Sequence, residues 1–290
     1  MEKNNFNNTT EQLVFMKFLR KVLSTEFDYG PNGIYTEPYN LDKSVEIAFS
    51  FLNSINMLNQ IDINNITFIK VYPDEKDVIK ELAEKNIFDS TFAIINNKQF
   101  LILFVENKLS DIYAIVHELI HAYNLNKNTY KDNKLIEILS ICGELFLSDF
   151  LKEQNISDEY VKSSISRLKY TYSMSLLTTS NNVNMRKIRK KCEPSIEKIN
   201  NSVLNIDSNT SKVNKNINIE KALIYNYGLF FGSYIHQIND LDFFMELNQN
   251  ISKMKFENFI SEIGLQIRKN NLTRKSYKKI FKSSKIDYGV

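Results

Sequence analysis

The feature that most constrains this chain is a pair of histidines four residues apart, His117 and His121, with Glu118 between them. They form the pattern H-E-x-x-H in a chain that holds only three histidines in 290 residues. On an α-helix, side chains at positions i and i+4 lie on one face, so both imidazoles can reach one metal ion. This pattern on a helix is typical of the zinc-binding segment of metallopeptidases.

The glutamate of the motif suits a general base. Glu118 lies roughly 100° around the helix from His117, where its carboxylate can take a proton from a water molecule that the metal activates. The flanking residues are apolar almost all round the predicted helix, which predicts burial. Buried His and Glu side chains are costly unless they bind a metal or are paired. A buried helix with hydrogen-bonded histidines is the alternative interpretation.

A catalytic zinc site needs a third protein ligand. No third histidine follows at a suitable spacing, but Glu137 and Glu144 follow a polar loop at 126–133, on a second helix predicted from about 134 to 153. In an antiparallel helix pair, Glu137 lies near the level of the two histidines and is the predicted third ligand. Glu144 shares its face two turns further on and is predicted to hydrogen-bond a ligand histidine. A solvent-exposed or salt-bridged Glu144 is the alternative.

These segments resemble the zinc site of the oligoendopeptidase F and thimet oligopeptidase-like metallopeptidases. The stretch 108–122 is similar to the approach to that family's zinc helix. In the family's third-ligand segment, the ligand Glu is followed by Ser after three residues and by Glu after seven, and Glu137, Ser140 and Glu144 match this spacing. The resemblance implies one zinc ion per chain, with Ser140 beside its ligands. The family usually has Gly where this chain has Ile120, so we expect the helices to pack less closely.

The resemblance extends to the stretch YNYGLFFG at 225–232, which is similar to the family's tyrosine-rich helix. There, tyrosines and a nearby histidine bind substrate and stabilise the tetrahedral intermediate. This implies catalytic roles for Tyr225, Tyr227 and His236. The two tyrosines are about 200° apart on a helix, so both cannot point into one site. A core or surface position is the alternative for His236.

The predicted fold is mostly α with a small β-sheet, because glycine and proline are scarce, at 7 and 4 residues. The resemblance implies a gluzincin-type peptidase with an active-site helix pair. We expect an N-terminal helical lobe at 1–90 and a catalytic region at 91–290. Before the zinc helix the predicted elements are helices at 10–27, 41–59 and 74–85, a strand at 66–72, and a hairpin of strands 91–95 and 99–105.

The second strand of that hairpin directly precedes the zinc helix. Edge strands in zinc peptidases often bind the substrate main chain by strand addition. We therefore expect this strand to lie at the sheet edge and to bind substrate around Phe100, Ile102 and Phe104. A core strand without substrate contact is the alternative.

The composition excludes several classes of protein. A net charge of +3 implies no particular partner. Cys142 and Cys192 indicate no disulfide framework, and neither an apolar signal region nor a run of 18 apolar residues occurs. We expect a cytoplasmic protein without membrane contact. Basic clusters at 186–191 and 268–285 are interpreted as solvated helix faces, with binding of nucleic acid or an acidic peptide as the alternative.

Together these features predict a zinc-dependent endopeptidase, and the resemblance implies that its substrates are oligopeptides. One alternative is a site-specific cytoplasmic metallopeptidase that cleaves a dedicated protein or precursor peptide, like those that cleave phage-type repressors. The lead-in at 108–116 and the tyrosine segment disfavour the phage-type enzyme. Another alternative is a non-catalytic zinc- or peptide-binding protein. The intact Glu118 disfavours it, because a structural site needs no general base.

Overall fold

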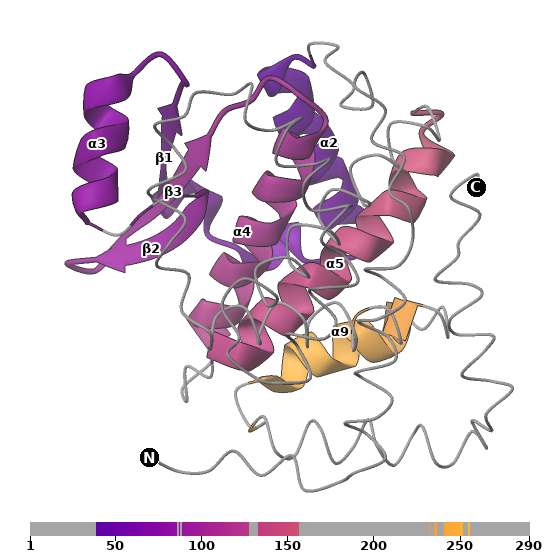
Figure 1. Cartoon of the computed structure of the whole chain (residues 1–290). Helices are drawn as coiled ribbons and strands as arrows, with labels where there is room; N and C mark the ends of the chain where they lie inside the picture. The colour runs from indigo at the N-terminus through magenta and orange to yellow at the C-terminus, as the bar shows by residue number, and fades with distance from the viewer. Residues whose placement is uncertain are drawn as a thin grey trace, which may run out of the picture.

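The computed structural model describes residues 39–85, 87, 89–127, 133–156, 232, 235–236, 241–251 and 255. In this part of the chain helices predominate, and three strands form one small sheet (Figure 1). The prediction of a mostly helical fold with a small sheet is confirmed. The predicted helix at 10–27, Tyr225, Tyr227, Cys192 and both basic clusters lie outside the described residues.

The sheet is built from β1 (Ile66–Val71), β2 (Thr91–Ile95) and β3 (Lys98–Phe104) in the order β1-β3-β2. β1 runs parallel to β3, and β2 runs antiparallel to it. Asn96 and Asn97 form the turn between β2 and β3 with φ angles of 50° and 62°, which suits a two-residue hairpin because asparagine tolerates positive φ. The predicted domain boundary at residue 90 passes through this sheet, between β1 and β2.

The prediction that the strand before the zinc helix is an edge strand is wrong. β3 is the central strand, and its main-chain groups pair with β1 on one side and β2 on the other. A substrate strand therefore cannot add to it. Phe100, Ile102 and Phe104 alternate with the core residues Leu101 and Leu103 and so lie on the opposite face of the sheet. Among the described residues, β1 and β2 are the edge strands of the sheet.

Helix α2 (Leu41–Ser54) begins at Asn40, whose side chain accepts hydrogen bonds from two main-chain N–H groups of the first turn. It ends short of the predicted residue 59 because Asn56 adopts a left-handed φ of 56°, a common way to end a helix. The 3-10 turns η1 (Leu58–Gln60) and η2 (Ile63–Asn65) lead into β1. Beyond β1, the short helix α3 (Lys76–Glu84) has no buried residue.

Two long helices, α4 (Ser110–Lys127) and α5 (Asn133–Glu153), form the centre of the fold, with α2 packed on α4 and α9 (Leu241–Asn250) on α5 (Figure 1). They are antiparallel, because residues late in α4 contact residues early in α5: His121 lies beside Glu137, whereas Tyr113 contacts Ser148. None of the described helices is both long and apolar enough to cross a bilayer.

Ile120 of α4 packs against Gly143 of α5. A Cβ atom on Gly143 would overlap Cδ1 of Ile120 and lie 3.5 Å from Cζ of Phe244 in α9. The absence of a side chain at Gly143 thus makes room for the fully buried Ile120. The glycine that makes room for Ile120 thus lies on the facing helix, α5.

Candidate metal centre

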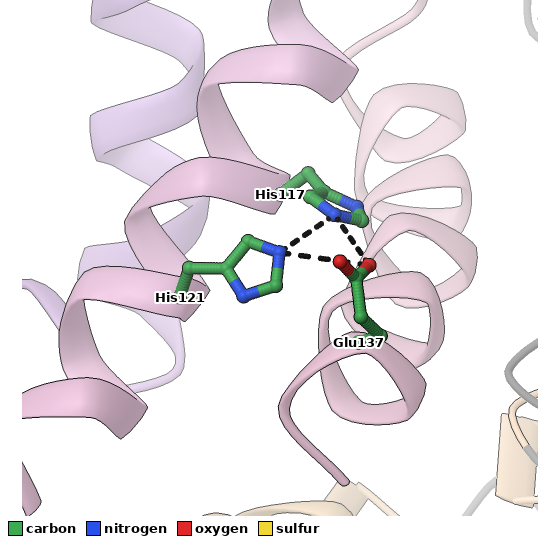
Figure 2. Close-up of side chains that lie close together, drawn as sticks. All are labelled: His117, His121 and Glu137. Carbon is green, nitrogen blue, oxygen red and sulfur yellow. Dashed lines mark hydrogen bonds and ion pairs between the residues drawn. The ribbon is translucent and has the colours of Figure 1, made fainter. Parts of the chain in front are cut away.

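Three potential metal ligands converge between α4 and α5. His117 and His121 project from α4 and Glu137 projects from the first turns of α5, so that one ligand atom of each lies within 4.8 Å of the others (Figure 2). The two Nε2 atoms are 2.9 Å apart. Oε2 of Glu137 lies 3.3 Å from Nε2 of His117 and 3.7 Å from Nε2 of His121. The structure therefore brings together the three residues predicted as ligands.

The spacing fits a tetrahedral metal ion. Zinc binds imidazole nitrogen and carboxylate oxygen at about 2.0–2.1 Å, which places tetrahedral ligand atoms about 3.3–3.4 Å apart. The separations of 2.9, 3.3 and 3.7 Å bracket this value. Oε2 of Glu137 is buried and faces both imidazoles, although no contact within the described part of the chain has the geometry of a hydrogen bond. A cation held between the three side chains would pair with this oxygen. This group can hold a metal ion, and two nitrogens with one oxygen suit zinc.

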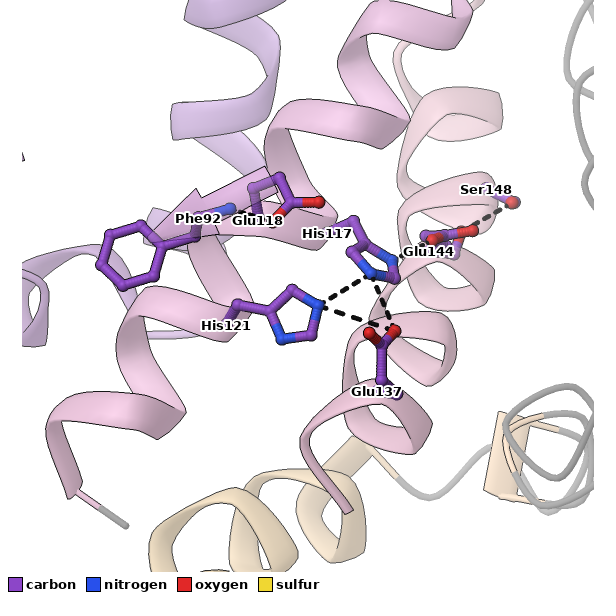
Figure 3. A network of polar contacts seen from close by, with 7 residues as sticks. All are labelled: Phe92, His117, Glu118, His121, Glu137, Glu144 and Ser148. Atoms are coloured by element: carbon purple, nitrogen blue, oxygen red, sulfur yellow. Dashed lines mark hydrogen bonds and ion pairs between the residues drawn. The ribbon is translucent and has the colours of Figure 1, made fainter. Parts of the chain in front are cut away.

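A carboxylate behind His117 fixes the orientation of its ring. Nδ1 of His117 contacts Oε1 of Glu144, the residue predicted to support a ligand histidine (Figure 3). A buried carboxylate accepts hydrogen bonds, so Nδ1 carries the proton and Nε2 presents its lone pair to the metal position. Ser148 continues the network by donating to the main-chain oxygen of Glu144 at 2.9 Å, and its hydroxyl lies 3.2 Å from that of Tyr113.

The charges of the centre are coupled. Burial lowers the pKa of His117, but the carboxylates of Glu137 and Glu144 outweigh burial and raise it well above the ordinary value. Burial raises the pKa of Glu137, but the positive field of His121 and the contacts with His117 lower it overall. Without a metal the group therefore resembles an ion pair of imidazolium and carboxylate. A divalent cation bound by His117, His121 and Glu137 would have to replace that proton.

Glu118 lies on the side of α4 that faces the sheet. Its side chain is buried, and Oε2 accepts a hydrogen bond of 2.6 Å from the main-chain N–H of Phe92 in β2 (Figure 3). Burial raises the pKa of Glu118, although the neighbouring histidines partly offset this effect. A carboxylate with a raised pKa next to a metal position has the properties of a general base.

The other predicted site residues lie in different places. Ser140 is on α5 between Glu137 and Glu144, fully buried, and its hydroxyl has no hydrogen-bond partner among the described residues.

The prediction that His236 reaches the site is wrong. Its Nε2 lies 2.6 Å from Oδ2 of Asp149, and Asp149 is twelve residues, or about 18 Å of helix, beyond Glu137. His236 instead joins its segment to the far half of α5.

Sequence reasoning missed the contact made by Phe92. A main-chain donor carries no side-chain signature, so only the position of β2 beside α4 reveals it.

Comparisons with models of known protein families, with curated proteins and with solved structures give no match to this chain. The geometry of the candidate metal centre is therefore the basis for proposing a function.

Proposed function

We propose that this chain is a zinc-dependent peptidase of gluzincin type, in which His117, His121 and Glu137 hold the metal. The observation that carries the proposal is the convergence of two Nε2 atoms and one carboxylate oxygen, at 2.9 to 3.7 Å from one another, beside the buried Glu118. A purely structural zinc site usually has four protein ligands, whereas a hydrolytic site has three and keeps one position open.

The chain's own residues would divide the work of peptide hydrolysis. When bound, zinc polarises the scissile carbonyl and lowers the pKa of a water molecule. Glu118 accepts the proton of the attacking water at a carboxylate oxygen and passes it to the leaving amine. Glu144 keeps the ring of His117 in the required tautomer. Tyr225 or Tyr227 remains our candidate for a hydrogen bond to the oxyanion.

An oligopeptide in extended conformation is the substrate we propose. The open edge of β2, rather than β3, is the candidate for main-chain pairing, because Phe92 of β2 already contacts Glu118. Ile94 and Ile95, further along β2, are about half exposed, at 46% and 50%, and offer apolar contact to a substrate side chain. A dedicated protein or precursor peptide with an accessible extended segment would use the same edge.

The test is cleavage of a mixed oligopeptide library by the zinc-reconstituted protein, with products identified by mass spectrometry. Glu118→Gln should abolish cleavage and leave zinc binding intact, because its amide oxygen still accepts a hydrogen bond but cannot take a proton. Glu84→Gln, on the exposed face of α3, is the matched control and should cleave like the wild type. Full zinc loading without cleavage of any peptide would instead favour a binding protein.

A further inference from the structure

The main-chain N–H of Phe92 donates a hydrogen bond to one carboxylate oxygen of Glu118 (Figure 3). We propose that this N–H is the positioning group of the general base: it holds Oε2 of Glu118 against β2 and leaves Oε1 for proton transfer. The inference rests on the proposed peptidase function. It assigns to strand β2 a part in the chemistry that is separate from any pairing with substrate.

The register of the hairpin explains why this donor is available. A two-residue turn closes the hairpin, so the flanking pair, Ile95 and Lys98, exchanges main-chain hydrogen bonds. Exchanging and non-exchanging pairs alternate along an antiparallel ladder. Phe92 and Leu101, three pairs further along, therefore do not exchange hydrogen bonds. The N–H of Phe92 points away from β3, toward the open edge of the sheet, where it meets Glu118.

Burial makes this donor important for Glu118. The residue is only 6% exposed, and an ionised carboxylate in such a position is costly without hydrogen-bond donors. The contact spans 2.6 Å, a length typical of a strong bond to a charged acceptor. Because Phe92 is itself a core residue in a paired strand, the donor is held rigidly. The carboxylate is thus confined to one orientation relative to the two histidines.

The contact also joins two separate elements. Glu118 belongs to α4, which carries both histidines, and Phe92 belongs to the hairpin that packs beside it. A purely structural link between helix and hairpin is the competing explanation. The two explanations predict different effects of removing the N–H of Phe92. Loss of a structural link changes folding and metal binding, whereas loss of a positioning group lowers kcat and leaves folding, KM and metal affinity unchanged.

The contact itself can be tested without any activity, by amide hydrogen exchange of the zinc-loaded full chain. The N–H of Ile94 points to the same open edge and is the internal control. We expect exchange at Phe92 to be at least about tenfold slower than at Ile94. This protection should persist in Glu118→Gln and disappear in Glu118→Ala. Unprotected exchange at Phe92 in the wild type would overturn the proposal.

The positioning role is tested by replacing a single main-chain N–H with an ester oxygen. Phenyllactic acid at position 92 deletes the donor and keeps the ring. The hydroxy-acid analogue of valine at position 78 makes the same main-chain change in the exposed first turn of α3, away from β2 and Glu118, and is the matched control. We expect the change at 92 to lower kcat by about 10- to 100-fold relative to the control, with KM and zinc affinity within about twofold.

The outcomes separate this inference from the proposed function. Equal kcat for the two esters would show that Phe92 is only a structural link. A wild-type protein that loads zinc and cleaves no peptide refutes the peptidase function, and the role of Phe92 in catalysis falls with it. In that case the exchange experiment still decides whether the contact between Phe92 and Glu118 exists.

Discussion

Glu144→Gln tests how the protein orients the proposed metal ligand His117. The Glu144 side chain is 4% exposed, and its carboxylate contacts Nδ1 of His117. The glutamine amide oxygen can still accept this hydrogen bond, so the ring keeps its place but loses the negative charge that makes it a better ligand. Loss of such a partner typically costs 10- to 100-fold in metal affinity, which corresponds to about 1.4–2.7 kcal/mol. We expect the lower half of this range, because one hydrogen bond survives.

The assay is competition for zinc against a chromophoric chelator at fixed pH, with the dissociation constant fitted for each variant. Glu153→Gln makes the same chemical change at the exposed end of α5 and should leave zinc affinity unchanged. A Glu144→Gln affinity within twofold of wild type would refute the reasoning, because the contact with His117 would then contribute nothing to metal binding.

In the metal-free protein, the same substitution should change how folding stability depends on pH. Glu137 and Glu144 raise the pKa of His117, so the folded state holds its proton more tightly than the unfolded state. This stabilisation is fully present below the unfolded value of about 6.5 and is lost as pH rises through the higher folded pKa. With zinc removed, wild-type stability should therefore fall more steeply than that of Glu144→Gln at alkaline pH, as measured by urea unfolding.

Three further predictions follow from other contacts. Gly143→Ala should destabilise the fold by about 1–3 kcal/mol, because the new methyl group overlaps Ile120. In an Ile120→Val background, which lacks Cδ1, the same change should be neutral or stabilising. Equal changes in the free energy of urea unfolding in both backgrounds would contradict this prediction. Zinc binding near pH 7 should release about one proton, because His117 must be neutral to bind; a calorimetric enthalpy that does not depend on the buffer would contradict it. Burial raises the pKa of Asp149, but the hydrogen bond from His236 helps to lower it overall. The ionised Asp149 therefore stabilises the folded state above about pH 3.9, and this stabilisation is lost as pH falls through the folded pKa. Asp149→Asn should flatten the stability profile in acid by less than about 1 kcal/mol, because the side chain is 44% exposed and screened; an unchanged acid profile would refute this.

Local spacing explains which features could be predicted from the sequence. His117 and His121 are four residues apart on one helix, and Glu137 and Glu144 are seven apart on the next, so helical periodicity alone places each pair on one face. The short loop then makes the helices antiparallel neighbours. The paired helices, the hairpin and the set of converging ligands all depend on contacts that are close in sequence.

Features that depend on distant segments could not be predicted in this way. The sequence of β3 does not reveal that β1, about thirty residues earlier, pairs with the side of β3 that β2 leaves unpaired. This pairing makes β3 the central strand. The position of His236 depends on which part of α5 its segment packs against. The space that Gly143 provides for Ile120 appears only when the two helices are side by side. In each case a long-range packing choice decides the outcome.

The central claim is that His117, His121 and Glu137 together bind one zinc ion. It is tested most directly by metal analysis and zinc X-ray absorption of the full chain after reconstitution, with Glu137→Gln measured in parallel. The account predicts one zinc per chain, nitrogen and oxygen neighbours at about 2.0–2.1 Å including two imidazoles, and weaker loading of the variant. Absence of stoichiometric zinc in the wild type, or a sulfur neighbour at about 2.3 Å, would contradict it.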